Sequence, residues 1–145
     1  MDFLTGMRVS SSGMSAQRAR MNTIASNIAN VNTTRAPEGG PYRRKEVVFA
    51  ALPQQRNFGE ILAGKVDEDI NRVQVVDIRP DRKGPIMKYD PTHSDANEEG
   101  YVAYPDINVM QEMVDMLQAS RSYEANISAM NTTKNMALSA IELGR

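Results

Sequence analysis

The sequence predicts an α+β protein, in which two long terminal α-helices form a coiled-coil-like core and flank a small β-rich middle domain. All seven prolines lie between Pro37 and Pro105, so neither end of the chain contains the residue that costs about 3 kcal/mol inside a helix. Nine of the ten methionines lie outside that interval, and the segments typical of strands lie inside it. The chain therefore divides into an N-terminal helix and loop (residues 1–36), a middle domain (37–105) and a C-terminal helix (106–145).

The N-terminal segment carries a heptad repeat, which indicates a helix with one packed seam. Two neighbouring core positions of the repeat are apolar, the first in Met7, Met14, Met21 and Ile28 and the second in Phe3, Ile24 and Val31. Ser10 and Gln17 take the two remaining inner positions, and Gly13 lies between them. We therefore expect the packing there to be close and partly polar.

Asparagines crowd the end of this repeat, at positions 27, 30 and 32. Asparagine is a poor residue for a helix interior but is tolerated as a left-handed cap. The helix is therefore expected to end near Ala29, and the chain to continue into a loop.

The C-terminal segment predicts a second long helix with a wider apolar face. Pro105 predicts a turn, and Asp106 after it is able to cap the first free amide groups of a helix. Two core positions are then largely apolar, in Met113, Ile127 and Ile141 and in Met116, Tyr123, Met130 and Ala137. A further partial row, Met110, Leu117 and Leu138, widens the face beyond what one partner helix would cover. We expect more than one neighbour, and a helix stop at Gly144.

The middle domain contains four strand-like segments, at residues 47–52, 72–79, 86–89 and 101–104. Residues 57–66 fit either one or two helical turns or a loop, and the sequence does not decide between them. Residues 90–100 are rich in turn-forming types and predict an exposed loop.

Composition excludes several classes of protein. A formal net charge of −1 with 24% charged residues argues against a basic nucleic-acid surface and against disorder. The absence of cysteine excludes disulfides and cysteine-bearing zinc sites. No apolar run approaches the roughly 20 residues that span a bilayer, and the first residues lack the pattern of a cleaved signal peptide. We expect no nucleic-acid partner, no membrane insertion and no cofactor.

His93 is the only histidine, and with Asp90 and Asp95 nearby it is the one candidate for a metal ligand or an acid/base pair. It lies in the predicted loop beside Pro91, and its spacing matches neither a calcium loop nor a zinc motif. The chain also lacks a phosphate-binding glycine pattern and a reactive thiol. We therefore expect a solvated loop rather than an enzyme.

Two further features have competing interpretations. The basic run at residues 43–45 fits contact with an anionic ligand, but three charges before a strand more often form a solvated edge that discourages strand pairing. The methionine-rich faces fit a core within one chain, a promiscuous groove or an assembly surface. Assembly is favoured, because the faces are wide and flank a middle domain that can bury little by itself.

Two segments far apart in the chain resemble one known family. Residues 10–35 are similar to the N-terminal signature of the bacterial flagellar axial family of rod, hook and hook-associated proteins, most specifically in ASNIANVNT at 25–33. Residues 112–144 resemble the C-terminal helix of that family, most specifically in SRSYEAN at 120–126. The similarity therefore includes both predicted helices.

The middle of the chain, at residues 41–49 and 88–107, resembles the proximal-rod members of that family. The resemblance implies a structural subunit of the proximal rod of the flagellar basal body, the drive shaft that transmits torque from motor to hook. It implies helical assembly with copies of itself and with other proximal and distal rod proteins. It also implies a location in the cell envelope and delivery by the flagellar type III export apparatus, without a cleaved signal peptide.

The residue pattern and the resemblance together predict an assembly interface on the two terminal helices. Its predicted members are Met7, Met14, Met21, Ile24, Asn27, Ile28, Asn30, Val31, Met113, Met116, Leu117, Tyr123, Asn126, Ile127, Met130, Asn131, Leu138 and Ile141. We also predict that side-chain amides fix the register between helices that methionine alone would let slide, namely those of Asn27, Asn30, Asn32, Asn126 and Asn131. Replacing Asn27 or Asn30 by leucine should then preserve helicity and impair rod completion. In the unassembled subunit, both ends should be less protected than the middle.

Three alternatives remain open on the sequence. The nearest is another rod or hook subunit of the same axial structure. A helical secretion adaptor or chaperone would use the same amphipathic faces but would not need both family signatures. A small hydrolase centred on His93 is the most remote.

Overall fold

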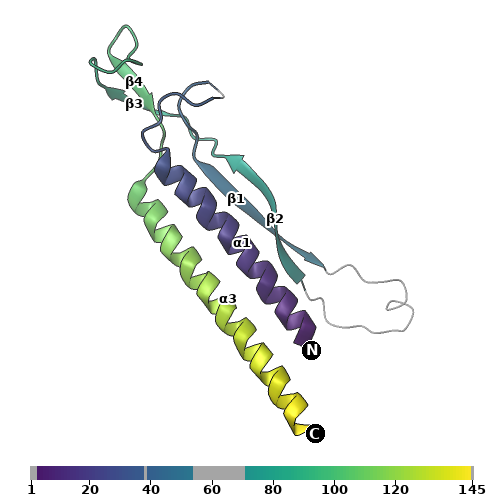
Figure 1. Cartoon of the computed structure of the whole chain (residues 1–145). Coiled ribbons are helices and arrows are strands. Elements are labelled where there is room, and N and C mark those ends of the chain that lie inside the picture. Colours follow the sequence, from purple (N-terminus) through teal and green to yellow (C-terminus); the bar gives the residue numbers. More distant parts are fainter. Residues whose placement is uncertain (1–2, 38, 54–70, 145) are drawn as a thin grey trace.

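The structure, a computed structural model, describes residues 3–37, 39–53 and 71–144, which form an elongated molecule (Figure 1). Helix α1 (Phe3–Ala29) and helix α3 (Val109–Leu143) lie side by side and run in opposite directions. The chain ends of the two helices therefore lie at the same end of the molecule. The predicted fold class, α+β with two long terminal helices, is confirmed.

Two antiparallel hairpins make up the β structure. Strands β1 (Lys45–Pro53) and β2 (Asn71–Pro80) form a long hairpin that packs along α1, and β3 (Ile86–Tyr89) and β4 (Tyr101–Tyr104) form a short one. The short hairpin lies at the end of the molecule opposite the termini (Figure 1). All four predicted strands are confirmed, and the expectation for residues 57–66 lies outside the described residues.

Helix α1 is the central layer of the molecule. It packs against α3 on one side and against β1 and β2 on the other, whereas α3 contacts no other helix or strand in the described part of the chain (Figure 1). A long helix with a single neighbour leaves most of its surface uncovered. None of the described helices is apolar enough over its length to cross a bilayer.

The start of α3 differs from the prediction. Asn108, rather than Asp106, is the N-cap, and its side-chain oxygen accepts hydrogen bonds from the backbone N–H groups of Met110 and Gln111. The chain first makes a tight turn, in which the N–H of Ile107 donates to the carbonyl oxygen of Pro105. The helix consequently begins after Asn108. The predicted end is confirmed, because Gly144 is the C-cap.

The end of α1 is where the sequence places it, at Ala29, but asparagine does not end it in the expected way. Among the described residues only glycines have positive φ, so no asparagine is a left-handed cap. Asn27 lies inside the helix and is buried. Asn30 follows the last turn, and its side-chain N–H donates to the carbonyl oxygen of Ser26 at 2.8 Å. The side chain of Asn30 thus supplies a hydrogen-bond donor to a carbonyl group in the last turn of the helix.

Candidate functional site: an assembly interface on the terminal helices

A row of small and polar residues lies between α1 and α3. A Cβ atom added to Gly13 would lie 3.0–3.2 Å from the side-chain amide of Asn126, and one added to Gly6 would lie 3.7 Å from Thr133. Gly6 and Gly13 are seven residues apart, and so are Thr133 and Asn126 on the antiparallel partner. We call these four residues the seam. The seam lets the two backbones approach closely, as the sequence predicts around Gly13.

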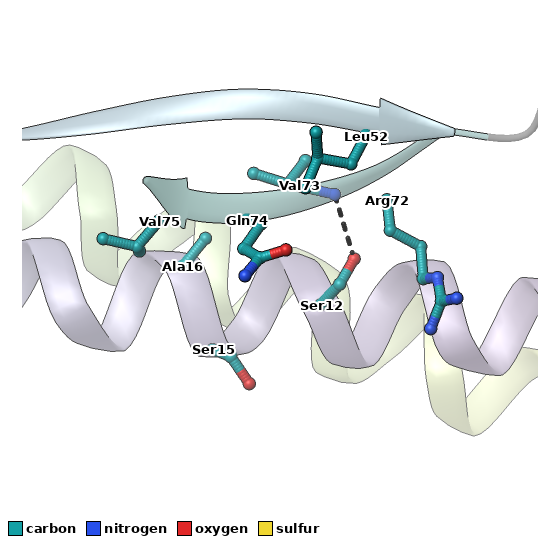
Figure 2. Close-up of a pocket in the computed structure, with 8 residues that line it drawn as sticks. All are labelled: Ser12, Ser15, Ala16, Leu52, Arg72, Val73, Gln74 and Val75. Carbon is teal, nitrogen blue, oxygen red and sulfur yellow. Dashed lines mark hydrogen bonds between the residues drawn. The ribbon is translucent and has the colours of Figure 1, made fainter. Parts of the chain in front are cut away.

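The opposite side of α1 faces the long hairpin. The hydroxyl of Ser12 accepts a hydrogen bond from the backbone N–H of Val73 in β2 at 3.3 Å (Figure 2). Ala16 of α1 is buried, and it lines a groove of about 800 Å³ between α1 and the long hairpin. The side chains of α1 that line this groove are small, namely Ser12, Ser15 and Ala16.

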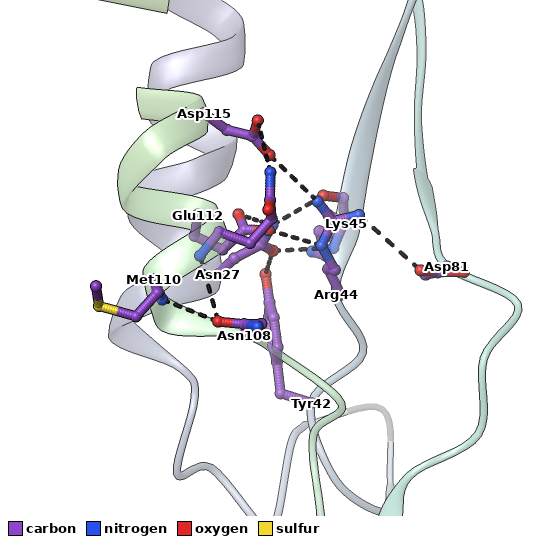
Figure 3. A network of polar contacts seen from close by, with 10 residues as sticks. Asn27, Tyr42, Arg44, Lys45, Asp81, Asn108, Met110, Glu112 and Asp115 are labelled. Atoms are coloured by element: carbon purple, nitrogen blue, oxygen red, sulfur yellow. Dashed lines mark hydrogen bonds and ion pairs between the residues drawn. The ribbon is translucent and has the colours of Figure 1, made fainter. Parts of the chain in front are cut away.

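Asn27 joins three segments of the chain at the other end of the seam (Figure 3). Its side-chain N–H groups donate to the carbonyl oxygen of Lys45 at 2.9 Å and to Glu112 at 3.0 Å. Its side-chain oxygen accepts from the backbone N–H of Lys45 at 2.9 Å and from the hydroxyl of Tyr42 at 3.1 Å. Asn27 is 1% exposed, and these four bonds use its full hydrogen-bonding capacity.

Glu112 is the buried charge of this network. It is 1% exposed and lies in the first turn of α3, where the helix dipole favours a negative charge. Arg44 donates from Nε to Glu112 at 2.7 Å, and its other nitrogens lie 3.9 Å from Asp81 and 4.0 Å from Asp115. The buried carboxylate is therefore paired with a guanidinium and also accepts from Asn27, as a buried charge requires.

The electrostatics of Arg44 agree with this geometry. Burial disfavours its charged form, but the hydrogen bond and charge of Glu112, with the charges of Asp81 and Glu46, outweigh burial and raise the pKa of Arg44. We call Asn27, Tyr42, Arg44 and Glu112 the polar lock, because they join α1, the start of β1 and α3. The interpretation of residues 43–45 as a solvated edge is therefore wrong for Arg44, and holds for the exposed Arg43.

The structure distributes the predicted interface residues over three environments. Ile24 and Asn27 are buried. The residues that lie in or beside the seam or follow α1 are partly exposed, namely Met7, Met14, Met21, Ile28, Asn30, Val31, Met116, Tyr123, Asn126 and Met130. The exposed ones all lie on α3, namely Met113, Leu117, Ile127, Asn131, Leu138 and Ile141. The methionine row of α1 thus lies beside the seam rather than in it.

The five asparagines proposed to set register play different parts. Asn27 connects elements of its own chain, whereas the side chain of Asn30 bonds to Ser26 one turn back. Asn126 donates to the carbonyl oxygen of Ser122 on its own helix while it lies against Gly13. Asn32 and Asn131 are exposed. Only Asn27 therefore joins the two helices by hydrogen bonding within the subunit.

Sequence reasoning missed Glu112, Tyr42 and the role of Arg44. Glu112 and Asn27 are 85 residues apart, and Glu112 and Arg44 are 68 apart, so no local pattern reports their pairing. One pattern in the sequence does indicate the side of α3 that faces α1. Glu112, Ala119, Asn126 and Thr133 recur every seven residues on α3, as Gly6 and Gly13 do on α1.

His93 lies in the loop between β3 and β4. Its Nδ1 accepts from the backbone N–H of Asp95 at 3.1 Å, and its ring packs edge-on against Tyr104. Asp95 in turn bonds to Thr34 and Arg35, which ties the loop to the segment after α1. The described residues contain no cluster of three potential metal ligands. The contacts of His93 are those of a structural loop residue.

Comparison with known proteins gives matches at both ends and over the whole chain. The family model described as "Flagella basal body rod protein" matches residues 7–36, and the model described as "Flagellar basal body rod FlgEFG protein C-terminal" matches residues 98–143. The matched segments contain most of α1 and all of α3. They include residues 10–35 and all but the last residue of 112–144, on which the resemblance to the flagellar axial family rests.

Full-length relatives are named "Flagellar basal-body rod protein FlgC". The one from Borreliella burgdorferi is 41% identical over 99% of this chain and 98% of its own length. The one from Bacillus subtilis is 42% identical over 96% of each chain, and the one from Yersinia enterocolitica is 39% identical over the whole of both. The resemblance is therefore confirmed: the chain belongs to the FlgC family of flagellar basal-body rod proteins.

Proposed function

We propose that this chain is a structural subunit of the proximal part of the flagellar rod, and that its terminal helices are the surfaces through which it assembles. It would join copies of itself and other rod proteins into the shaft that carries torque from motor to hook. The family membership supports the role as a rod subunit. The arrangement of α1 and α3 supports assembly through the terminal helices.

One observation carries the proposal: α3 exposes large apolar side chains along its length, and α1 is the only helix or strand that it contacts in the described part of the chain. Leu117 is 61% exposed and Ile141 is 67% exposed. Met110, Met113, Val114 and Leu138 are exposed on the same helix. A row of large apolar side chains along a helix of 35 residues is typical of a surface that another helix covers.

The side of α3 that faces α1 supports the same proposal. The seam and the polar lock occupy the side of α3 that faces α1, so the apolar side chains on the other side remain available for neighbouring subunits. A shaft that rotates without slipping needs several such interfaces for each subunit, because simultaneous contacts reinforce one another. The half-buried methionines of α1 would widen the contact, since methionine adapts to irregular surfaces.

The division of the chain fits this role. Residues 1–36 and 106–145 would supply the helices of the shaft, and residues 37–105 would lie outside them. We further propose that the chain reaches the cell envelope through the flagellar type III export apparatus, without removal of a signal peptide, and that it catalyses no reaction.

The test replaces an exposed apolar residue on α3 by a charged one. Leu117→Glu should leave the helical content of the purified subunit unchanged, because the side chain of Leu117 is 61% exposed. In a strain that lacks the native gene, it should abolish rod assembly and swimming, since a desolvated carboxylate would be left in the interface. Swimming is scored in soft agar, and rods are counted in isolated basal bodies.

Gln118→Glu is the matched control, because Gln118 is the next residue on α3 and is also exposed. It introduces the same charge one position away from the apolar row and should swim normally. Normal swimming with Leu117→Glu would rule out the outer face of α3 as an assembly surface. Binding of the wild-type chain to one exported client, without incorporation into basal bodies, would favour an adaptor instead.

A further inference from the structure

The seam between α1 and α3 is periodic, so it does not by itself fix the register of the two helices. Gly6 lies against Thr133 and Gly13 against Asn126, and the two pairs are seven residues apart on each helix. A shift of α3 by seven residues, about 10.5 Å, would place Gly6 opposite Asn126 in one direction and opposite Ala140 in the other. Gly13 already accommodates an asparagine, and alanine is smaller. The seam therefore permits close approach in the observed register and in both shifted ones.

The other contacts near the two helices restrain the register only weakly. The methionines beside the seam are partly exposed, and methionine adapts to irregular surroundings because its side chain is unbranched and flexible. Beyond α1, Asp95 of the short-hairpin loop accepts a hydrogen bond from Thr34 and pairs with Arg35, whose side chain is 79% exposed. An exposed ion pair and one hydroxyl hydrogen bond contribute little free energy.

Glu112 differs from these contacts because it is buried and charged. Among the described residues it is the only charged side chain that is buried. Its Oε1 accepts from Nε of Arg44 at 2.7 Å, and its Oε2 accepts from the side-chain N–H of Asn27 at 3.0 Å (Figure 3). Asn27 belongs to α1 and Arg44 directly precedes β1, so the two donors come from different elements. Both carboxylate oxygens are therefore satisfied where these elements meet α3 in the observed register.

A shift of α3 by seven residues in either direction would separate Glu112 from both donors. In one direction the carboxylate would pass beyond the end of α1 at Ala29. In the other it would come opposite Arg20, where one cation would replace two donors, and Asn27 would face the turn before α3. A buried charge without its partners is costly, and a polar residue at one core position sets the register of coiled coils in this way.

We propose that Glu112 is the positioning residue that sets the register of α3 on α1, whereas the seam supplies close approach without choosing a register. The role expected of five asparagines then belongs to one carboxylate and its two donors. The register also decides where the exposed apolar side chains of α3 lie along the molecule. The proposal concerns pairing within one subunit and does not depend on the proposed rod function.

Disulfide formation within the purified, full-length chain tests the register, because the chain has no cysteine of its own. Three double variants combine Gly6→Cys with Thr133→Cys, Asn126→Cys or Ala140→Cys, which report the observed register and the two shifted ones. A disulfide requires Cα atoms within about 7 Å of each other, so a shift of about 10.5 Å is resolved. Each protein is equilibrated at low concentration in a glutathione buffer, and the disulfide fraction is read by electrophoresis after free thiols are blocked.

With Glu112 intact, we expect only the pair of Gly6→Cys and Thr133→Cys to close. With Glu112→Leu added, the equilibrium constant for closing at least one shifted pair should rise at least about tenfold, because no register then leaves a buried carboxylate unpaired. Glu124→Leu is the matched control, since it removes an exposed carboxylate from the same helix. It should leave the closing of all three pairs unchanged.

The outcomes separate setting the register from merely stabilising the subunit. If Glu112→Leu lowers the midpoint of urea unfolding but closes neither shifted pair, the proposal is overturned. It is equally overturned if the shifted pairs close as readily with Glu112 intact. Should Glu112→Leu not fold, Glu112→Gln is measured with the same pairs and the same expected rise, because its amide turns a donor toward Asn27. Each of these results is obtained on the free subunit and leaves the rod function untouched.

Discussion

Asn27 shows how one side chain can join the helical core to the β structure. Its amide makes four hydrogen bonds, to Lys45, Tyr42 and Glu112, in a site that water does not reach. Leucine has a similar size and a higher helix propensity but offers none of these bonds. Its introduction would leave backbone groups of Lys45 and an oxygen of Glu112 buried without a partner.

Asn27→Leu should therefore destabilise the isolated subunit by roughly 1–3 kcal/mol for each buried partner left unpaired. Urea unfolding followed by circular dichroism measures the effect. Asn22→Leu is the control, because Asn22 is exposed on the same helix, and it should change the free energy of unfolding by less than about 0.5 kcal/mol. The expected defect in rod completion would then begin with the stability of the subunit. Equal stabilities of the two variants would show that the polar lock contributes nothing.

At the scale of elements, the seam between α1 and α3 depends on close approach rather than on apolar volume. A methyl group at Gly13 would lie only 3.0–3.2 Å from the side chain of Asn126, so this side chain would have to shift, whereas one at Gly6 would lie at an ordinary contact distance from Thr133. Asn126 cannot move away freely, because its side chain donates to the carbonyl oxygen of Ser122 at 3.0 Å. The two glycines therefore differ in role although both belong to the same heptad row.

Gly6→Ala should stabilise the subunit by about 0.5–1 kcal/mol, since alanine is the better helix former and the space exists. Gly13→Ala carries the same gain in propensity, but overpacking of the seam typically costs about 1–3 kcal/mol. We expect Gly13→Ala to be the less stable variant by at least about 1 kcal/mol in urea unfolding. A Gly13→Ala protein as stable as Gly6→Ala would mean that the helices are not held at this distance.

At the scale of the whole molecule, burial is uneven along its length. The fully buried side chains of the described residues all lie between Ala16 and Ala119, in the part that contains the polar lock. Toward the termini no described side chain is buried, and Phe3, Leu4 and Ile141 are exposed. A helix whose apolar face is uncovered is marginally stable in water.

Amide hydrogen exchange in the isolated subunit should follow this gradient. Residues 3–12 and 130–143 should exchange at least tenfold faster than residues 16–29 and 109–120, because local opening there breaks few buried contacts. Assembled basal bodies should protect both sets, since neighbouring subunits would cover the exposed faces. Mass spectrometry of peptides from the two samples measures the difference. Equal protection of all four segments in the free subunit would contradict the expectation that its ends are incomplete surfaces.

The elements that the sequence predicts correctly are those specified by local patterns. The end of α1 at Ala29, both long helices and all four strands follow from the distribution of proline, heptad periodicity and alternation. The N-cap of α3 was placed two residues early, because Asp106 and Asn108 have similar capping propensity and only the turn after Pro105 distinguishes them.

The sequence by itself determined the fold class, the family and the existence of amphipathic helices, since each depends on residue types repeated at short range. Only the tertiary structure decided which row of each helix faces its partner, because the methionine row and the glycine row of α1 share one period and differ in how closely they let backbones approach. It also decided that Glu112, Arg44 and Asn27 meet. A buried charge finds its partners by chain folding over long sequence separations, and no local pattern carries that information.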